Sequence, residues 1–87
     1  MRGIHFVPDA WGAYLYWQDQ DKKTLKRLNT LITAAAREPF IGIGKPEPLR
    51  GELSGYWSRR IDEANRLVYR ATDTDLVVIA CRFHYDG

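Results

Sequence analysis

The fold of this chain is decided by the segment YWSRRIDEANRLVYRATDTDLVVIACRF, which covers residues 56–83. Runs rich in β-branched and aromatic residues predict three strands within it, at 56–63, 66–71 and 76–83. The connections between these runs are short and contain Asn, Asp and Thr, which is typical of hairpins. The segment therefore predicts an antiparallel meander.

Upstream of the meander, the sequence predicts one strand and two helices. Residues 3–7 form a short apolar run that a proline stops, as expected of a strand. Helical spacing follows over residues 9–19, with Asp9 as the expected N-cap, and Asp21 is placed to cap a second helix. Pro39 ends this second helix, so the two helices are predicted to form a hairpin. Its core-facing stripe consists of Leu25, Leu28, Leu31, Ile32 and Ala35.

Between the helices and the meander, proline or glycine occupies seven of the seventeen positions in residues 39–55. This stretch is therefore predicted to be a loop without a long helix or strand. The resulting order is a strand, a two-helix hairpin and then three to four antiparallel strands, which predicts the α+β class. A chain of 87 residues has room for one core, so residues 1–87 are expected to form a single domain.

The composition excludes several classes of protein. Apolar residues make up 45% of the chain, which favours a folded domain, but no apolar run approaches the ~20 residues of a membrane span. The N-terminus has no signal-peptide pattern, so a cytoplasmic location is expected. With Cys81 as the only cysteine and two histidines far apart, neither a disulfide nor a metal site is predicted, and no cofactor is expected.

Strand alternation predicts which side chains share a face of the sheet. Odd-numbered residues, among them Trp57, Arg59, Leu67 and Cys81, are predicted to face the core, where the Cys81 thiol would be inert. The even-numbered residues are predicted to form a cluster of polar side chains on the other face, namely Arg60, Arg66, Arg82 and His84. From these residues alone two interpretations stay open, structural ion pairs with acidic neighbours or a phosphate-binding site, and composition favours the ion pairs.

Four ordered motifs resemble a known family. They are KPEPL at 45–49, LSGYWSRRI at 53–61, RLVY at 66–69 and ACRFHY at 80–85, and YLYWQ at 14–18 extends the likeness to the N-terminus. With these motifs the chain resembles the YoeB-type toxins of the RelE-like superfamily of bacterial toxin–antitoxin systems. The resemblance implies a compact, microbial-ribonuclease-like fold, cleavage of messenger RNA in the ribosomal A site, and neutralisation by a YefM-type antitoxin.

The same resemblance implies the site residues, position by position. It implies a catalytic role for Glu47, Arg66, His84 and Tyr85. It implies substrate binding by Lys45, Arg50 and Arg60. Three features depart from the family pattern. Arg50 stands where Lys is frequent, Asp86 and Gly87 follow the usual terminal His-Tyr pair, and the turn at 63–65 is unusual, so no supporting role is predicted for it.

Cleavage of RNA by its own 2′-hydroxyl needs a base, a positive environment for the phosphorane and an acid for the 5′-oxygen, and needs no metal. Glu47, held between two prolines, is interpreted as the base and His84 as the acid, while Arg66 and Arg60 would bind the scissile phosphate. Tyr85 would orient or stack on the substrate. The expected products are a 2′,3′-cyclic phosphate and a 5′-hydroxyl end.

The partners implied by the resemblance are the 70S ribosome, messenger RNA and a YefM-type antitoxin, and a homodimer is left open. Two other functions are compatible with the same fold. One is inhibition of DNA gyrase by protein contact, as in ParE-like toxins, and the other is ribosome or RNA binding without cleavage. The joint presence of Glu47, Arg66 and His84 argues against the gyrase interpretation.

Overall fold

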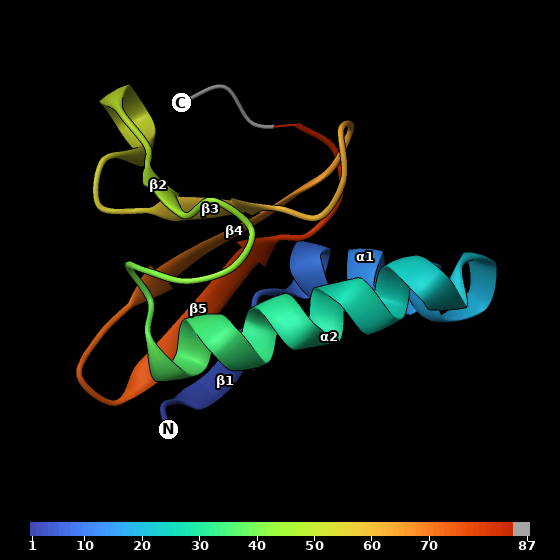
Figure 1. Ribbon diagram of the computed structural model, residues 1–87, viewed down its shortest axis with the longest axis horizontal. Coiled ribbons are helices and arrows are strands. Elements are labelled where there is room, and N and C mark those ends of the chain that lie inside the picture. The colour runs from blue at the N-terminus through green and yellow to red at the C-terminus, as the bar shows by residue number, and fades with distance from the viewer. Residues whose placement is uncertain (85–87) are drawn as a thin grey trace.

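The computed structural model describes residues 1–84 and consists of one sheet and two helices (Figure 1). The elements in chain order are β1 (Gly3–Phe6), α1 (Pro8–Gln20), α2 (Lys22–Arg37), β2 (Glu47–Pro48), the 3₁₀ turn η1 (Gly51–Leu53), β3 (Trp57–Arg60), β4 (Arg66–Ala71) and β5 (Asp75–Ala80). The predicted α+β class is confirmed, with an antiparallel meander that runs from β2 to β5. Within the described part of the chain, no helix is long and apolar enough to cross a membrane.

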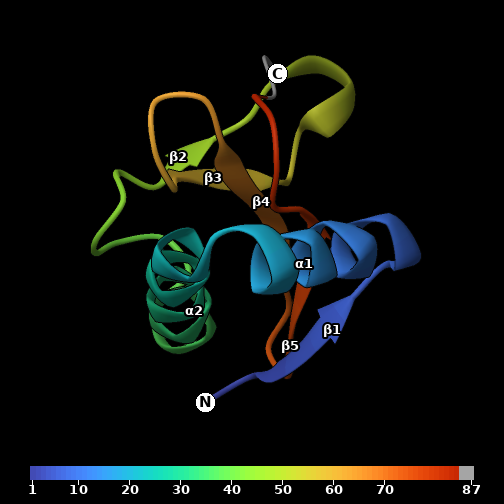
Figure 2. The same ribbon diagram turned by 90° about the vertical axis from the view of Figure 1, so that its right-hand side faces the viewer.

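The sheet has five strands in the order β1-β5-β4-β3-β2, and both helices pack on the same face of it (Figure 2). Strand β1 runs parallel to β5, so the sheet is mixed, and the helical hairpin forms part of the connection that parallel strands require. The opposite face of the sheet is left without a helix. This uncovered face is where the candidate site lies.

The helical hairpin follows the predicted pattern closely. Asp21 alone separates the helices and caps α2, its carboxylate accepting a hydrogen bond from the Thr24 backbone N–H at 3.0 Å. That bond holds the pKa of the Asp21 carboxyl below its ordinary value. Helix α1 differs from the prediction, because Val7 is its N-cap and Pro8 opens its first turn, where the fixed proline φ suits a helix start. Asp9 therefore lies within the first turn and is not the cap.

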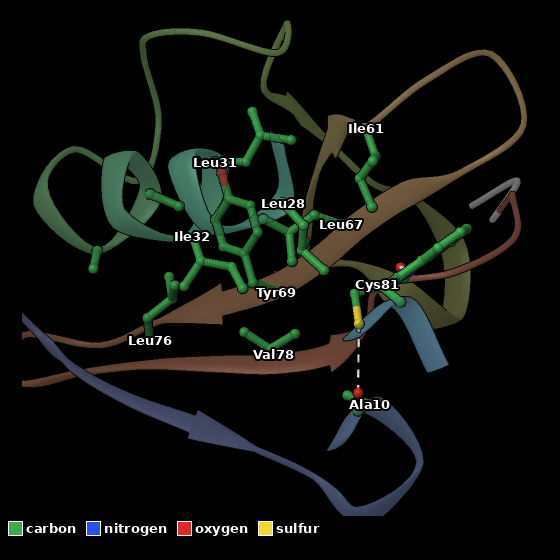
Figure 3. Packing of buried hydrophobic residues seen from close by; sticks show 13 residues of the cluster. Ala10, Leu28, Leu31, Ile32, Ile61, Leu67, Tyr69, Leu76, Val78 and Cys81 are labelled. Atoms are coloured by element: carbon green, nitrogen blue, oxygen red, sulfur yellow. Dashed lines mark hydrogen bonds between the residues drawn. The ribbon is translucent and has the colours of Figure 1, made fainter. Parts of the chain in front are cut away.

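The core lies between the helices and the covered face of the sheet (Figure 3). Leu28 and Leu31 from α2 and Leu67 and Tyr69 from β4 have no exposed surface. Full burial of a leucine side chain contributes about 2 kcal/mol of transfer free energy, so these contacts are a main source of stability. At the other end of the core, the Trp17 indole donates a hydrogen bond of 2.8 Å to the Cys81 carbonyl and thereby ties α1 to the segment after β5.

The predicted alternation is confirmed in β3 and β4 and is wrong in β5. Leu76 and Val78, which are even-numbered, are fully buried in the core, whereas Val77 and Ile79 are only half-buried. The reason is the register: Tyr69 pairs with Val78 but Val68 pairs with Ala80, so Ile79 is an extra residue in a β-bulge. The bulge resets the alternation, and Cys81 therefore reaches the core as predicted.

Of the three predicted strands of the meander, β4 has the predicted bounds, whereas β3 and β5 end earlier than predicted. Strand β3 ends at Arg60, and residues 61–65 form a wide turn in which the Asp62 carboxylate accepts hydrogen bonds of 2.8 Å from the backbone N–H groups of Ala64 and Asn65. Such a local carboxylate bond competes with strand pairing, which explains the early end. Strand β5 likewise ends at Ala80 and not at residue 83.

Candidate active site

The strand register places three of the predicted site residues on the uncovered face. Glu47 pairs with Ser58, Arg60 lies two residues further along β3, and Arg60 pairs with Arg66 of β4. Residues directly opposite in an antiparallel pair point to the same side of a sheet, and so do residues two apart on one strand. One carboxylate and two guanidinium groups therefore share one end of this face.

Glu47 is presented on a short and stiff segment. It is exposed and lies between Pro46 and Pro48, and β2 pairs with β3 on one side only, because it is the edge strand. Downstream, a hydrogen bond of 2.9 Å from the Leu49 N–H to the Tyr56 carbonyl continues the attachment. Within residues 1–84 the Glu47 carboxylate makes no hydrogen bond or ion pair. It is therefore available to accept a proton.

Arg66 is the most enclosed charged group of this face, with an exposed fraction of 8%. Its Nη1 donates hydrogen bonds to two backbone carbonyls of the preceding turn, Asp62 at 2.8 Å and Asn65 at 3.2 Å. One edge of the guanidinium is thus fixed by the protein. The rest of the planar group retains donors, in the fork geometry that suits phosphate oxygens.

The segment after β5 runs beside the start of β4 (Figure 1). The Arg66 backbone N–H donates to the Phe83 carbonyl at 2.9 Å, and the Phe83 N–H donates to the Asn65 side-chain oxygen at 2.7 Å. These two bonds hold the residue immediately before His84 against Arg66. His84 itself is exposed at this end of the sheet, and Tyr85 lies outside the described residues.

Asn65 was missed by the sequence interpretation, which predicted no supporting role for its turn. Besides its bond to Phe83, its amide Nδ2 donates to both carboxylate oxygens of Asp62, at 3.1 and 3.2 Å. Asn65 therefore connects the β3–β4 turn to the segment that carries His84. The spacing of Asp62 and Asn65, three residues apart before a strand, is the local signal that would have indicated this turn.

The remaining predicted cations divide into two groups. Lys45 and Arg50 are exposed on either side of Glu47, Lys45 with a left-handed φ of 53°. Arg82 was expected beside Arg60 and Arg66, and this prediction is wrong. Its guanidinium lies 3.5 Å from the ring centroid of Tyr16 on α1, because β5 ends at Ala80 and the segment beyond it no longer follows the alternation of a strand.

Cys81 takes no part in this site. Its thiol is fully buried and lies 3.4 Å from the Ala10 carbonyl (Figure 3). Among the residues that the structure describes, no group of three His, Cys, Asp or Glu side chains is arranged to hold a metal ion.

Burial raises the pKa of the Cys81 thiol from an ordinary 9.0 to about 12. The reactive thiolate is the form that burial disfavours, so at pH 8 the native protein is expected to react with an aromatic disulfide reagent about a thousandfold more slowly than the unfolded chain. The measurement is the absorbance of released thiolate with and without urea. Rapid labelling of the native protein would contradict the buried position of the thiol.

Residues 6–85 match the family model described as the YoeB-like toxin of bacterial type II toxin–antitoxin systems. The chain belongs to this family. YoeB toxins are ribosome-dependent endonucleases of messenger RNA, and the resemblance seen in the sequence motifs is thereby confirmed.

Relatives and solved structures agree with this membership. Toxin YoeB of Synechocystis sp. is 61% identical over 82 residues, covering 94% of this chain and 95% of that protein. Toxin YoeB of Mycobacterium bovis is 56% identical over 85 residues, covering 98% of this chain and all of that protein, 100%. The structure of a YoeB/ParE toxin from Agrobacterium tumefaciens is 46% identical, covers 95% of this chain and 99% of that chain, and superposes with a TM-score of 0.91.

A YoeB–YefM heterotetramer from Staphylococcus aureus contains a chain that is 42% identical to this one, with a TM-score of 0.89 and coverage of 98% and 99%. The structure of YafQ from Escherichia coli is 23% identical with a TM-score of 0.72, covers 97% of this chain and 94% of that chain, and shows a common fold alone. These structures therefore share the architecture of this chain over nearly its whole length.

Proposed function

We propose that this toxin cleaves messenger RNA in the ribosomal A site through Glu47, Arg66 and His84, and that a YefM-type antitoxin neutralises it. The observation that supports this proposal most directly is the common position of a carboxylate and two arginines on the uncovered face, with the His84 segment hydrogen-bonded to Arg66. Family membership supplies the substrate class.

The groups on this face can perform each step of an RNA transesterification. Glu47 removes the proton of the 2′-hydroxyl, the 2′-oxygen forms a bond to phosphorus, and the bond from phosphorus to the 5′-oxygen breaks. His84 donates a proton to the leaving 5′-oxygen. Arg66 and Arg60 stabilise the charge that develops on the phosphorane oxygens. The products are a 2′,3′-cyclic phosphate and a 5′-hydroxyl.

The exposed residues beside Glu47 suit a message that the ribosome holds in place. Lys45 and Arg50 are exposed beside Glu47, where they can contact phosphates on either side of the scissile bond. Tyr85 is assigned a stacking role by its place in the family motif. Because Glu47 lies on an open edge strand, the ribosome would supply the substrate orientation that a deep active site otherwise provides.

Partner proteins follow from the family structures. The S. aureus complex contains YoeB with YefM, and another S. aureus structure is of a YoeB dimer, 42% identical to this chain with a TM-score of 0.90. We assign this chain the same kind of antitoxin and the capacity to form a homodimer. The cationic end of the sheet is a surface that an antitoxin would have to block.

The proposed nucleophile can be tested on the substrate without altering the toxin. A message with a single 2′-deoxynucleotide at the scissile position of the A-site codon is expected to resist cleavage by at least about a hundredfold, because it lacks the attacking oxygen. Primer extension in a reconstituted translation reaction measures the cut, and the all-ribose message is the matched control. Equal cleavage of both messages, or cleavage with ribosomes omitted at the same rate, would contradict the proposal.

A further inference from the structure

Arg59 is the largest side chain with no exposed surface in the described part of the chain. It follows Ser58 on β3 and points to the covered side of the sheet, opposite to Arg60, as the alternation predicted. A buried guanidinium is costly unless every nitrogen is hydrogen-bonded. The hydrogen-bond acceptors of the Arg59 guanidinium therefore indicate the role of this residue.

All of these partners are neutral oxygens, and three of them belong to one loop. Nη2 donates to the carbonyls of Glu38 at 2.5 Å and Ile41 at 2.8 Å, and Nη1 donates to the carbonyl of Ile43 at 3.0 Å. Nε donates to the Tyr69 hydroxyl at 3.0 Å, and that hydroxyl donates to the Pro39 carbonyl at 2.6 Å. Directly or through Tyr69, Arg59 thus binds four carbonyls between residues 38 and 43.

Apolar burial accounts for only part of the position of this loop, in which Pro39 is buried. Phe40, Ile41 and Ile43 are exposed by 51%, 65% and 45%, so most of their apolar surface is not packed in the core. Phe40 has one aromatic contact, with Trp57 at 4.8 Å between ring centroids. The carbonyls of the loop instead point inward to the guanidinium, which makes hydrogen bonding its main attachment.

Two glycines allow the backbone to close around Arg59. A Cβ on Gly42 would lie 3.3 Å from Arg59 Nη1, and a Cβ on Gly44 would lie 2.6 Å from Leu31 Cδ2 and 3.2 Å from Arg59 Cβ. Both glycines have a positive φ, 119° and 82°, which favours glycine over other residues. The close approach of loop and arginine is therefore built into the sequence.

The loop leads directly to the candidate base. The Gly44 carbonyl accepts a hydrogen bond of 2.7 Å from the Arg60 N–H, and only Lys45 and Pro46 separate Gly44 from Glu47. Lys45 in the left-handed region and the proline after it leave this linker little freedom. A shift of the loop is thus transmitted to Glu47 and Lys45.

We propose that Arg59 is a positioning residue, which fixes the loop at 38–46 and through it the place of Glu47 beside Arg60 and Arg66. This inference rests on the proposed function, since it concerns the geometry of that same site. Arg59 touches no substrate in this scheme and acts chiefly through Glu47, the reacting group that its loop carries.

The test replaces Arg59 by lysine, which keeps the charge but cannot form the same set of directed bonds. The expected result is about a ten- to hundredfold fall in the single-turnover cleavage rate on programmed ribosomes, with an unchanged half-saturating ribosome concentration, because misplacement of a reacting group by about 1 Å has effects of this size. In the Glu47→Ala background, the same Arg59→Lys change is expected to alter the residual rate by less than about twofold, since coupled residues are not additive.

Two further measurements separate positioning from general destabilisation. Leu76→Ala removes a buried side chain of β5, and at a temperature where this variant remains folded it is expected to cleave like the parent protein. Amide exchange on the free toxin is expected to become at least about tenfold faster over residues 40–48 in Arg59→Lys and not over β4 and β5.

The outcomes are distinct from one another. The role of Arg59 would be overturned if Arg59→Lys lowered the rate equally in the parent protein and in Glu47→Ala. Unchanged amide exchange over residues 40–48 in Arg59→Lys would overturn it as well. Full activity of Glu47→Ala alone would overturn the proposed function, whereas the exchange measurement reads the attachment of the loop without any cleavage.

Discussion

Replacement of Glu47 by alanine is expected to lower the rate of A-site cleavage by about a hundred- to ten-thousandfold, the usual contribution of a general base. Glu47 is exposed, belongs to a two-residue edge strand, and is not hydrogen-bonded within residues 1–84. Its removal therefore leaves no buried group unsatisfied, and the fold should be unchanged. Glu47→Gln, which keeps the shape but cannot accept the proton, is expected to lose a comparable amount.

The measurement is primer extension on a defined message in a reconstituted translation reaction. Glu52→Ala is the matched control, because Glu52 is also an exposed glutamate, on η1, close to β2 in the chain. Cleavage that persists in Glu47→Ala would contradict the assignment of the base. Arrest of protein synthesis with an intact message in both parent and variant would instead support a toxin that acts by binding to the ribosome.

Arg66→Lys is expected to lower cleavage by about a hundred- to a thousandfold although the charge is kept, the size typical of one lost transition-state donor. The guanidinium has one edge fixed by the carbonyls of Asp62 and Asn65, which orients its other donors. A lysine ammonium at this position is a single point charge and cannot serve the turn and the phosphate together.

Arg70→Lys is the matched control for this prediction. Arg70 lies on the same strand, is exposed, and pairs with Val77 at the other end of β4. Its replacement is expected to leave cleavage within about twofold of the parent rate. Circular dichroism of Arg66→Lys shows whether the fold survives the change. A folded Arg66→Lys variant with full activity would remove Arg66 from the mechanism.

The helical hairpin and the meander could be predicted because their signals are local. The apolar stripe of α2 repeats within four residues, and its cap joins Asp21 to Thr24, three residues away. Strand β2 could not be predicted in this way. The two residues Glu47–Pro48 have no periodicity, and they become a strand only because they pair with Ser58 and Trp57 of β3.

The candidate site could likewise be predicted only in part from the sequence. Family motifs predicted Glu47, Arg60, Arg66 and His84 as site residues from the chain alone, and the strand register places the first three on one face. The polar cluster inferred from strand alternation included Arg82 incorrectly, because β5 ends at Ala80 and the alternation of a strand does not extend to Arg82. The strand-like residues at 80–83 give no local signal of that end.

By itself, then, the sequence determined the α+β class, the helical hairpin, the meander and the family, because each depends on spacings of a few residues or on ordered motifs. Only the tertiary structure decided the parallel pairing of β1 with β5, the support that Asn65 gives to the His84 segment, and the hydrogen bonds that join Arg59 to its loop. These features depend on partners far apart in the chain: the Arg59 guanidinium meets Tyr69 ten residues later and Glu38 twenty-one residues earlier. Hydrogen bonds over such separations form only after the chain has folded, so no local pattern records them.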